Sequence, residues 1–199
     1  LLSVSPLFQK MPWEQTKIYF GDERHVSHDH PDSNYRMAFE AMLKAIPPGL
    51  ENVYPIPTDH EDVEICAEFY EDLLRVQFQR RSDDIPRFDL ILLGIGADGH
   101  TASLFSGTPA AAERKRWVTW CDPAAANPEI KPAVKRITIT APVIWEAAHV
   151  MVLATGAEKT PVLAKIFDEN EPVNPPVSRL LRQCKGQVSF FVDRAAAGN

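Results

Sequence analysis

An acid and a histidine, Asp98 and His100, lie two residues apart in a glycine-rich turn that directly follows the apolar run 90–93. A histidine can take a proton from water near neutral pH and return it to a leaving oxygen, and a neighbouring carboxylate can fix its tautomer or stabilise its cation. No Ser or Cys stands in a nucleophile-elbow setting, so we expect no covalent acyl-enzyme. The pair therefore indicates direct attack by an activated water.

Three glycines shape the turn: Gly94, Gly96 and Gly99. Glycine permits positive φ angles and close approach of a ligand, and ligands of open α/β sheets bind just past the carboxyl ends of the strands. We therefore place a candidate substrate site at this turn and count the three glycines among its binding residues.

The same glycines match the G-x-G-x-x-G dinucleotide motif, and Asp122 follows at a suitable distance. That motif needs a full-length helix that begins inside it and holds the pyrophosphate at its N-terminus. Gly107 and Pro109 break the chain too soon for such a helix, and the motif does not explain His100. We therefore favour a site without nicotinamide and expect no cofactor.

Four basic residues lie at or near the ends of expected strands: Arg24, Lys131, Arg136 and Lys159. Lysine offers phosphate a point charge, and arginine offers it a planar fork of donors. Each residue alone is most simply a solvated surface charge. Together they indicate a phosphate-binding rim at the same edge of the sheet as the glycine turn.

A second polar cluster contains His25, His28 and His30 with Asp29 and Asp32, and it superficially resembles a metal site. The spacing matches no specific zinc pattern. A polar loop in which one or two of these groups touch a substrate is the simpler interpretation. We expect no metal.

Composition limits the classes of function. The 199 residues are 45% hydrophobic, which is typical of one domain with a substantial core. A net charge of -6 argues against nucleic acid or an anionic membrane as a partner. The sequence shows no signal peptide and no apolar stretch of about 20 residues. Three widely spaced cysteines fit reduced thiols in the cytoplasm: Cys66, Cys121 and Cys184.

Strands and helices alternate in the expected element order. We expect strands at 17–20, 53–56, 88–93, 117–121, 136–140, 150–154 and 188–192. We expect helices from Asp32 or Ser33 to Pro47, over about 60–80, at 101–105, after Pro142, after Lys159 and near 177–182. This order predicts a doubly wound, mostly parallel Rossmann-like sheet with helices on both faces. The unbroken apolar run 90–93 predicts a strand covered on both faces.

Over most of its length the chain resembles the 6-phosphogluconolactonases. The resemblance rests on the stretches 20–24, 32–34, 88–105, 136–140, 154–159 and 192–196, of which Asp-Gly-His-Thr-Ala-Ser-Leu-Phe at 98–105 is the most specific. It implies a doubly wound α/β domain and metal-independent hydrolysis of 6-phospho-D-glucono-1,5-lactone in the oxidative pentose phosphate pathway. It also implies a base at His100.

The hypothesis that follows assigns a role to each candidate residue. Asp98 orients His100, and Arg24 offsets charge on the tetrahedral oxyanion. Arg136 and Lys159, with Lys131, hold the 6-phosphate, and Asn34 contacts sugar hydroxyls. The partner is a small sugar phosphate, and we expect a monomer or a weak homo-oligomer.

Related glucosamine-6-phosphate deaminases share the fold and an Asp-Gly-His turn. In those enzymes the following segment ends in a glutamate that assists ring opening, whereas Phe105 ends it here. The absence of that acid favours lactone hydrolysis over amino-sugar isomerisation, which needs several proton transfers. A non-catalytic sugar-phosphate-binding or sensor domain is a third hypothesis.

The lactonase pattern also contains an early glycine- and serine-rich phosphate loop after a first strand. Residues 3–6 are at most a remnant of it, and the chain starts at Leu1. Either the chain is a fragment without its first strand–helix unit, or the loop was lost. We expect residues 1–199 to form a single lactonase-like domain that is truncated at its N-terminus.

Overall fold

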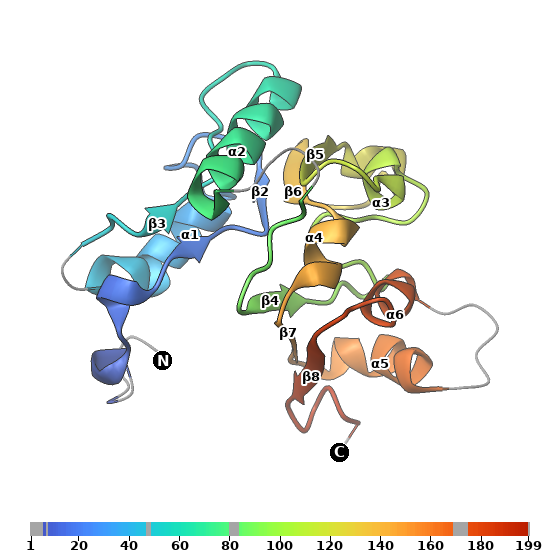
Figure 1. Ribbon diagram of the computed structural model, residues 1–199. Coiled ribbons are helices and arrows are strands. Elements are labelled where there is room, and N and C mark those ends of the chain that lie inside the picture. The colour runs from blue at the N-terminus through green and yellow to red at the C-terminus, as the bar shows by residue number, and fades with distance from the viewer. Residues whose placement is uncertain (1–5, 7, 47–48, 80–83, 169–174, 199) are drawn as a thin grey trace.

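The computed structural model describes residues 6, 8–46, 49–79, 84–168 and 175–198, along which strands and helices alternate (Figure 1). Two sheets are parallel. In the first, β1 (Ile18–Tyr19) pairs with β3 (Val53–Tyr54). In the second, the order is β4 (Ile91–Gly94), β7 (His149–Ala154) and β8 (Gln187–Val192). The α/β class and the parallel pairing are confirmed.

A third sheet is antiparallel and was not predicted. Its order is β2 (Asp22–Arg24), β6 (Arg136–Ile139) and β5 (Val118–Cys121). Residues 22–24 were expected to be the polar end of the preceding strand. Instead the Gly21 carbonyl accepts a hydrogen bond from Ile139 N at 2.9 Å, and residues 22–24 continue as a partner of β6. The chain therefore passes at Gly21 from the first parallel sheet into the antiparallel sheet.

The helices begin at recognisable caps. Helix α1 (Asn34–Ala41) starts after Ser33, whose Oγ accepts from Arg36 N at 3.1 Å, and α2 (Val63–Phe78) starts after Asp62, whose Oδ1 accepts from Glu64 N at 2.9 Å. Both expected helices are confirmed, although the first ends at Ala41 and a 3-10 turn (Leu43–Ala45) replaces its end. Pro47 and residue 80, where we expected the two ends, lie outside the described residues.

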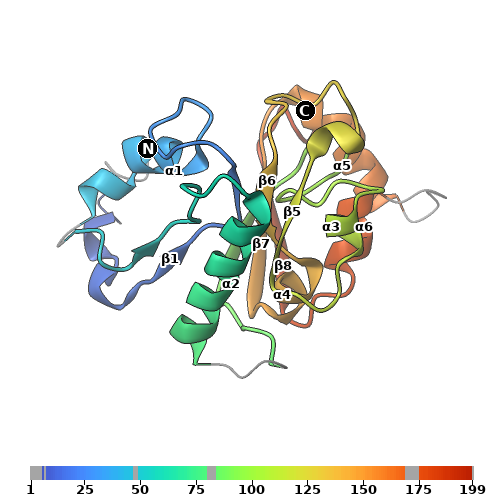
Figure 2. The same cartoon turned by 90° about the horizontal axis from the view of Figure 1, so that it is seen from above.

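Shorter helices complete the chain: α3 (Pro109–Ala112), α4 (Ala141–Glu146), α5 (Thr160–Phe167) and α6 (Pro176–Leu181). Three of them agree with the expected helices after Pro142, after Lys159 and near 177–182. The main core packs the buried face of α2, including Tyr70 and Leu74, against the strands and Trp117. A smaller cluster joins Phe8 and Trp13 to Leu43 and Ile46 in the N-terminal part of the chain. Figure 2 shows β1 and α1 on one side of the molecule and α3, α5 and α6 on the other.

The segment 101–105 is not the short helix that we predicted. Thr101 and Leu104 form an isolated antiparallel bridge, and Ala102 between them has φ +49°. The Thr101 hydroxyl donates to Gly94 O at 2.8 Å, which folds the segment back against the end of β4. The positive φ of Ala102 interrupts the helical conformation that the residue types of this segment favour.

Strand β4 is not covered on both faces in the part of the chain that the structure describes. Ile91 and Leu93 are buried, but Leu92 is 58% exposed and the preceding Leu90 is 46% exposed. The prediction from the unbroken apolar run was therefore wrong for one face of the strand. Buried and exposed side chains also alternate in the neighbouring strand β7, where Val152 is buried and Leu153 is 44% exposed.

Candidate active site

The turn after β4 brings Asp98 and His100 into direct contact. His100 Nδ1 lies 2.5 Å from Asp98 Oδ1, and the same oxygen accepts from His100 N at 3.2 Å. The hydrogen bond from the His100 side chain lowers the pKa of the Asp98 carboxyl, against the raising effect of its partial burial. This contact fixes the tautomer and leaves Nε2 without a hydrogen-bond partner among the described residues.

The glycines of the turn have different structural roles. Gly99 has φ +82° and donates to Gly96 O at 2.9 Å, while Gly96 N donates to His100 O at 2.8 Å. A Cβ on Gly96 would overlap the His100 ring and the Asp98 carboxylate. Gly94, in contrast, has open space where a Cβ would lie. Gly96 and Gly99 therefore shape the Asp98–His100 pair, and contact of any glycine with a substrate stays a prediction.

Two arginines face each other across the antiparallel sheet. Arg24 of β2 and Arg136 of β6 are directly opposite in register. Arg24 Nη1 donates to Asp32 O at 2.9 Å, whereas the buried Nε atoms of both arginines have no partner in the described structure. Burial, together with the nearby Arg24 charge, lowers the pKa of Arg136. Like charges paired across strands are unfavourable, so an anion between them would be strongly stabilised.

Phe105 links the histidine to the arginine pair. Its buried ring lies 4.2 Å from the His100 ring, centroid to centroid, and the Arg136 guanidinium carbon lies 5.3 Å from its centroid. The structure therefore brings His100 and Arg136 to the same buried aromatic side chain. A base and a cation pair so close together can act on one small anionic substrate.

Asp22 connects the histidine segment with α1, a link that the sequence did not reveal. Its Oδ2 accepts from Ser103 Oγ at 2.7 Å, and its Oδ1 accepts from Asn34 Nδ2 at 3.2 Å. Asn34, the predicted sugar-binding residue, thus lies beside the same carboxylate. The polar residues at positions 22 and 34 were a signal of a binding site in the sequence. Only the pairing of β2 with β6 places them at the site.

Glu23 is the second residue that sequence reasoning missed. Its side chain is fully buried and accepts from Arg24 N at 2.8 Å, Asn34 N at 2.6 Å and Tyr35 N at 2.7 Å. The Ser33 hydroxyl donates at 3.0 Å to Oε2, the same carboxylate oxygen that accepts from Tyr35 N. This carboxylate therefore holds the backbone of Arg24 and Asn34 in one arrangement.

Two predicted phosphate ligands are not joined to this cluster by any described contact. Lys159 lies in a 3-10 turn (Ala157–Lys159) after β7 and is 4.0 Å from the Glu158 carboxylate. Lys131 is exposed in the loop before β6, one residue from Pro132, whose carbonyl accepts from Arg136 Nη2 at 3.5 Å. Their phosphate contacts remain predictions.

The histidine-rich loop is held by its own neighbours. His25 Nε2 contacts His60 O at 2.8 Å, His28 Nε2 contacts Ile56 O at 2.8 Å, and His30 Nδ1 accepts from Asp32 N at 3.1 Å. Within the described residues, no three His, Cys, Asp or Glu side chains come together as a metal site. The loop thus supports the backbone around Arg24.

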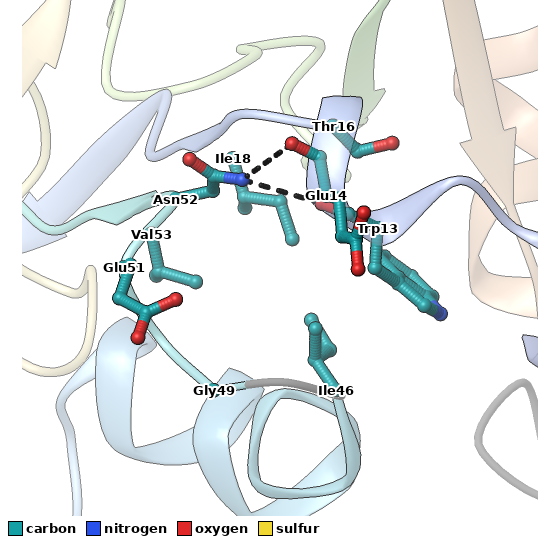
Figure 3. A pocket seen from close by; sticks show the side chains of 9 residues that line it. All are labelled: Trp13, Glu14, Thr16, Ile18, Ile46, Gly49, Glu51, Asn52 and Val53. Atoms are coloured by element: carbon teal, nitrogen blue, oxygen red, sulfur yellow. Dashed lines mark hydrogen bonds between the residues drawn. The ribbon is translucent and has the colours of Figure 1, made fainter.

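Two cavities show which region suits a phosphate. The cavity drawn in Figure 3, of about 120 Å³, lies in the N-terminal part and is lined by Glu14 and Glu51 but no basic residue, so it would repel a phosphate. A larger cavity of about 370 Å³ lies beside Asp98, between the glycine turn and helices α5 and α6, with Lys165 and Arg179 in its lining. Positive charge therefore surrounds the Asp98–His100 pair on more than one side.

Comparison with known proteins places the chain among proteins of one family. A family model described as "Glucosamine-6-phosphate isomerases/6-phosphogluconolactonase" matches residues 2–190. A 6-phosphogluconolactonase of Synechocystis sp. is 41% identical over 192 residues, which are 96% of this chain and 76% of that protein. One of Nostoc sp. is 38% identical, over 94% of this chain and 75% of that protein. The solved 6-phosphogluconolactonase of Trypanosoma cruzi superposes with a TM-score of 0.85 at 37% identity, over 100% of this chain and 77% of that one.

Proposed function

The chain belongs to the glucosamine-6-phosphate isomerase/6-phosphogluconolactonase family, and we propose that it hydrolyses 6-phospho-D-glucono-1,5-lactone to 6-phosphogluconate. The observation that carries this proposal is the Asp98–His100 pair placed against the same aromatic ring as Arg136. The reaction needs one base near a phosphate-binding group, and this arrangement supplies both. It is a step of the oxidative pentose phosphate pathway.

His100 acts as the base in the proposed mechanism. Its Nε2 takes a proton from water as the water oxygen attacks the lactone carbonyl, and the Asp98 carboxylate stabilises the resulting imidazolium through Nδ1. When the bond between the carbonyl carbon and the ring oxygen breaks, the imidazolium returns a proton to that oxygen. The product is the open-chain acid, which loses its proton to water at neutral pH.

Arg24 and the amides of the glycine turn are the proposed stabilisers of the oxyanion, each worth roughly 3 kcal/mol if well placed. Arg136 and Lys159, with Lys131, are the proposed ligands of the 6-phosphate. Asn34 is the proposed contact of the sugar hydroxyls. The unpartnered, buried Nε atoms of Arg24 and Arg136 support an anionic ligand beside these two arginines.

The amino-sugar isomerisation catalysed by the other branch of the family is less well supported. Phe105 stands at the end of the segment where the deaminases place a glutamate, and its buried ring cannot move protons. Lactone hydrolysis requires no such group.

The proposal extends to partners and compartment. The substrate is a small sugar phosphate, no metal or cofactor takes part, and the enzyme is a monomer or weak homo-oligomer. Cys66, Cys121 and Cys184 are free thiols, which supports a reducing compartment such as the cytoplasm. No helix in the described ranges is long and apolar enough to cross a membrane.

Substrate comparison tests the function. Freshly prepared 6-phosphogluconolactone, unphosphorylated gluconolactone and glucosamine 6-phosphate are each incubated with the protein against the spontaneous background. We expect turnover of the phosphorylated lactone far above that of gluconolactone, and no ammonia from glucosamine 6-phosphate. Ammonia release would favour the isomerase, and tight binding of 6-phosphogluconate without lactone turnover would favour a non-catalytic binding domain.

A further inference from the structure

Ser103 connects the segment that carries His100 to all three strands of the antiparallel sheet. Its Oγ donates to Asp22 Oδ2 of β2 at 2.7 Å, and its N–H donates to Thr138 Oγ1 of β6 at 3.2 Å. Its carbonyl oxygen accepts from Cys121 Sγ of β5 at 3.2 Å. Each polar group of Ser103 thus has its partner on a different strand, although Ser103 itself belongs to none of them.

These three contacts differ in strength. Ser103 and Thr138 are fully buried, and Cys121 is buried, so loss of a contact leaves a polar group without water to replace its partner. A thiol is a weak donor, and the contact with Thr138 joins two neutral groups. The bond from Ser103 Oγ ends on a carboxylate, and such charge-assisted bonds are the stronger kind. The contact with Asp22 is therefore the main attachment of Ser103 to the sheet.

The same segment is attached to a parallel sheet two residues earlier. Thr101 Oγ1 donates to Gly94 O of β4 at 2.8 Å, and Figure 1 shows β4 apart from the group formed by β2, β5 and β6. Ala102, between the two attachments, has φ +49°, a conformation that persists only where the surroundings hold it. Only three residues separate Ser103 from His100, so a shift of Ser103 is transmitted to the histidine.

The antiparallel sheet carries the groups that are proposed to bind the substrate. Arg24 lies two residues after Asp22 in β2 and is opposite Arg136 of β6. The Asp22 carboxylate also accepts from Asn34 Nδ2 at 3.2 Å. Ser103 therefore donates to the same carboxylate that holds Asn34, the proposed contact of the sugar hydroxyls. The contact between Ser103 and Asp22 joins the base side of the site to its binding side.

We propose that Ser103 is a positioning residue, which fixes the His100 imidazole relative to the substrate-binding side chains of the antiparallel sheet through its hydrogen bond to Asp22. This role rests on the proposed lactone hydrolysis, in which the base and the binding groups act on one molecule at the same time. A misplacement of about 1 Å can cost roughly a hundredfold in rate. Ser103 is fully buried and its hydroxyl donates to Asp22, so it acts through other residues and not on the substrate itself.

Ser103→Ala tests the proposal, and Thr140→Val is its matched control. Thr140 is also fully buried, but its Oγ1 donates to Arg116 O at 2.6 Å and not to a group of the candidate site. Each substitution removes one buried hydroxyl, so we expect both to lower the thermal midpoint. We expect only Ser103→Ala to lower kcat for the phosphorylated lactone, by about tenfold or more, with a smaller change in KM.

A second readout does not depend on turnover. The His100 ring lies 4.2 Å from the Phe105 ring, centroid to centroid, so the proton NMR signal of its Cε1–H contains a ring-current shift that depends on how the two rings lie. The signal is assigned by its loss in His100→Ala. We expect Ser103→Ala to move it and Thr140→Val to leave it in place.

Asp22→Ala removes the same hydrogen bond from its other side, at a residue that is only partly buried, and it serves if Ser103→Ala does not fold. We expect it to move the His100 signal as well. In the double variant, Ser103→Ala should add no further loss of kcat, because the acceptor is already gone.

A wild-type kcat in Ser103→Ala, an unmoved His100 signal, or additive losses in the double variant would each overturn the proposal. If the wild type itself shows no turnover, the proposed function fails. The NMR comparison then decides the positioning role of Ser103 by itself.

Discussion

Asp98 and His100 stabilise each other through a single short contact, and its effect on the carboxyl gives a pH prediction. The lowered pKa of Asp98 means that folding favours its ionised form. The stabilisation is therefore complete above the ordinary value of 3.8 and is lost as the pH falls through the lowered folded-state pKa. The effect on the free energy of unfolding is modest because half of the Asp98 side chain is exposed to solvent.

We expect wild type to be more stable than Asp98→Asn, and this difference in the free energy of unfolding to shrink as the pH falls below 3.8. Urea unfolding of both proteins between pH 2 and 7 measures it. A difference that persists undiminished at pH 2 would mean that the carboxylate charge is not what His100 stabilises.

Arg136 provides a prediction about charge geometry. Its guanidinium is buried beside Phe105 and opposite Arg24, where a planar fork can hold phosphate and a lysine ammonium cannot reproduce it. We expect Arg136→Lys to lower kcat/KM for the phosphorylated lactone about 10- to 100-fold, mainly through KM. Arg87→Lys, at an exposed position, is the control. An Arg136→Lys enzyme with an unchanged KM would remove this residue from the phosphate site.

Among the elements, the turn after β4 is closely packed at one glycine. Gly96 faces the Asp98–His100 contact so closely that a methyl group would displace it. We expect Gly96→Ala to reduce kcat at least a hundredfold, about the contribution of a positioned acid–base group, while far-UV circular dichroism stays near wild type. Gly21→Ala, where the added Cβ would lie 3.8 Å from Ile139, is the control. Full activity of Gly96→Ala would show that the observed contact is unnecessary.

The two capped helices allow structural and functional effects to be separated. Ser33 caps α1 next to Asn34 and Glu23, whereas Asp62 caps α2 through a contact with Glu64. Either substitution by alanine should lower the free energy of unfolding by about 1 kcal/mol. We expect only Ser33→Ala to raise KM as well, as measured by steady-state kinetics beside urea unfolding. Equal KM values for the two variants would contradict the role of the α1 N-terminus.

The sequence predicted most elements because their caps and apolar spacing are local. Helix α2, the strand β7 and the cap at Ser33 are examples. Contacts between distant side chains were beyond it: Asp22 accepts from Ser103 Oγ, and the buried Glu23 accepts from the N-terminus of α1. The prediction of a helix over residues 101–105 was also wrong, because Ala102 has a positive φ that interrupts a helix.

At the scale of the molecule, the site collects residues from distant parts of the chain. His100 follows β4, Arg24 and Arg136 come from the antiparallel sheet, and Asn34 begins α1. Although the chain carries a net charge of -6, its two opposed arginines concentrate positive charge beside the base. A small anion can therefore be attracted locally by a protein that repels larger polyanions.

The most direct test is hydrolysis of 6-phosphogluconolactone by residues 1–199 and by the His100→Ala variant, coupled to phosphogluconate oxidation and corrected for spontaneous hydrolysis. We predict a rate above background that falls at least a hundredfold in the variant, because the base is lost while the phosphate site remains. Binding of 6-phosphogluconate to both proteins checks that the site is intact. A variant that turns over the lactone at the wild-type rate would contradict the assignment of His100 as the base.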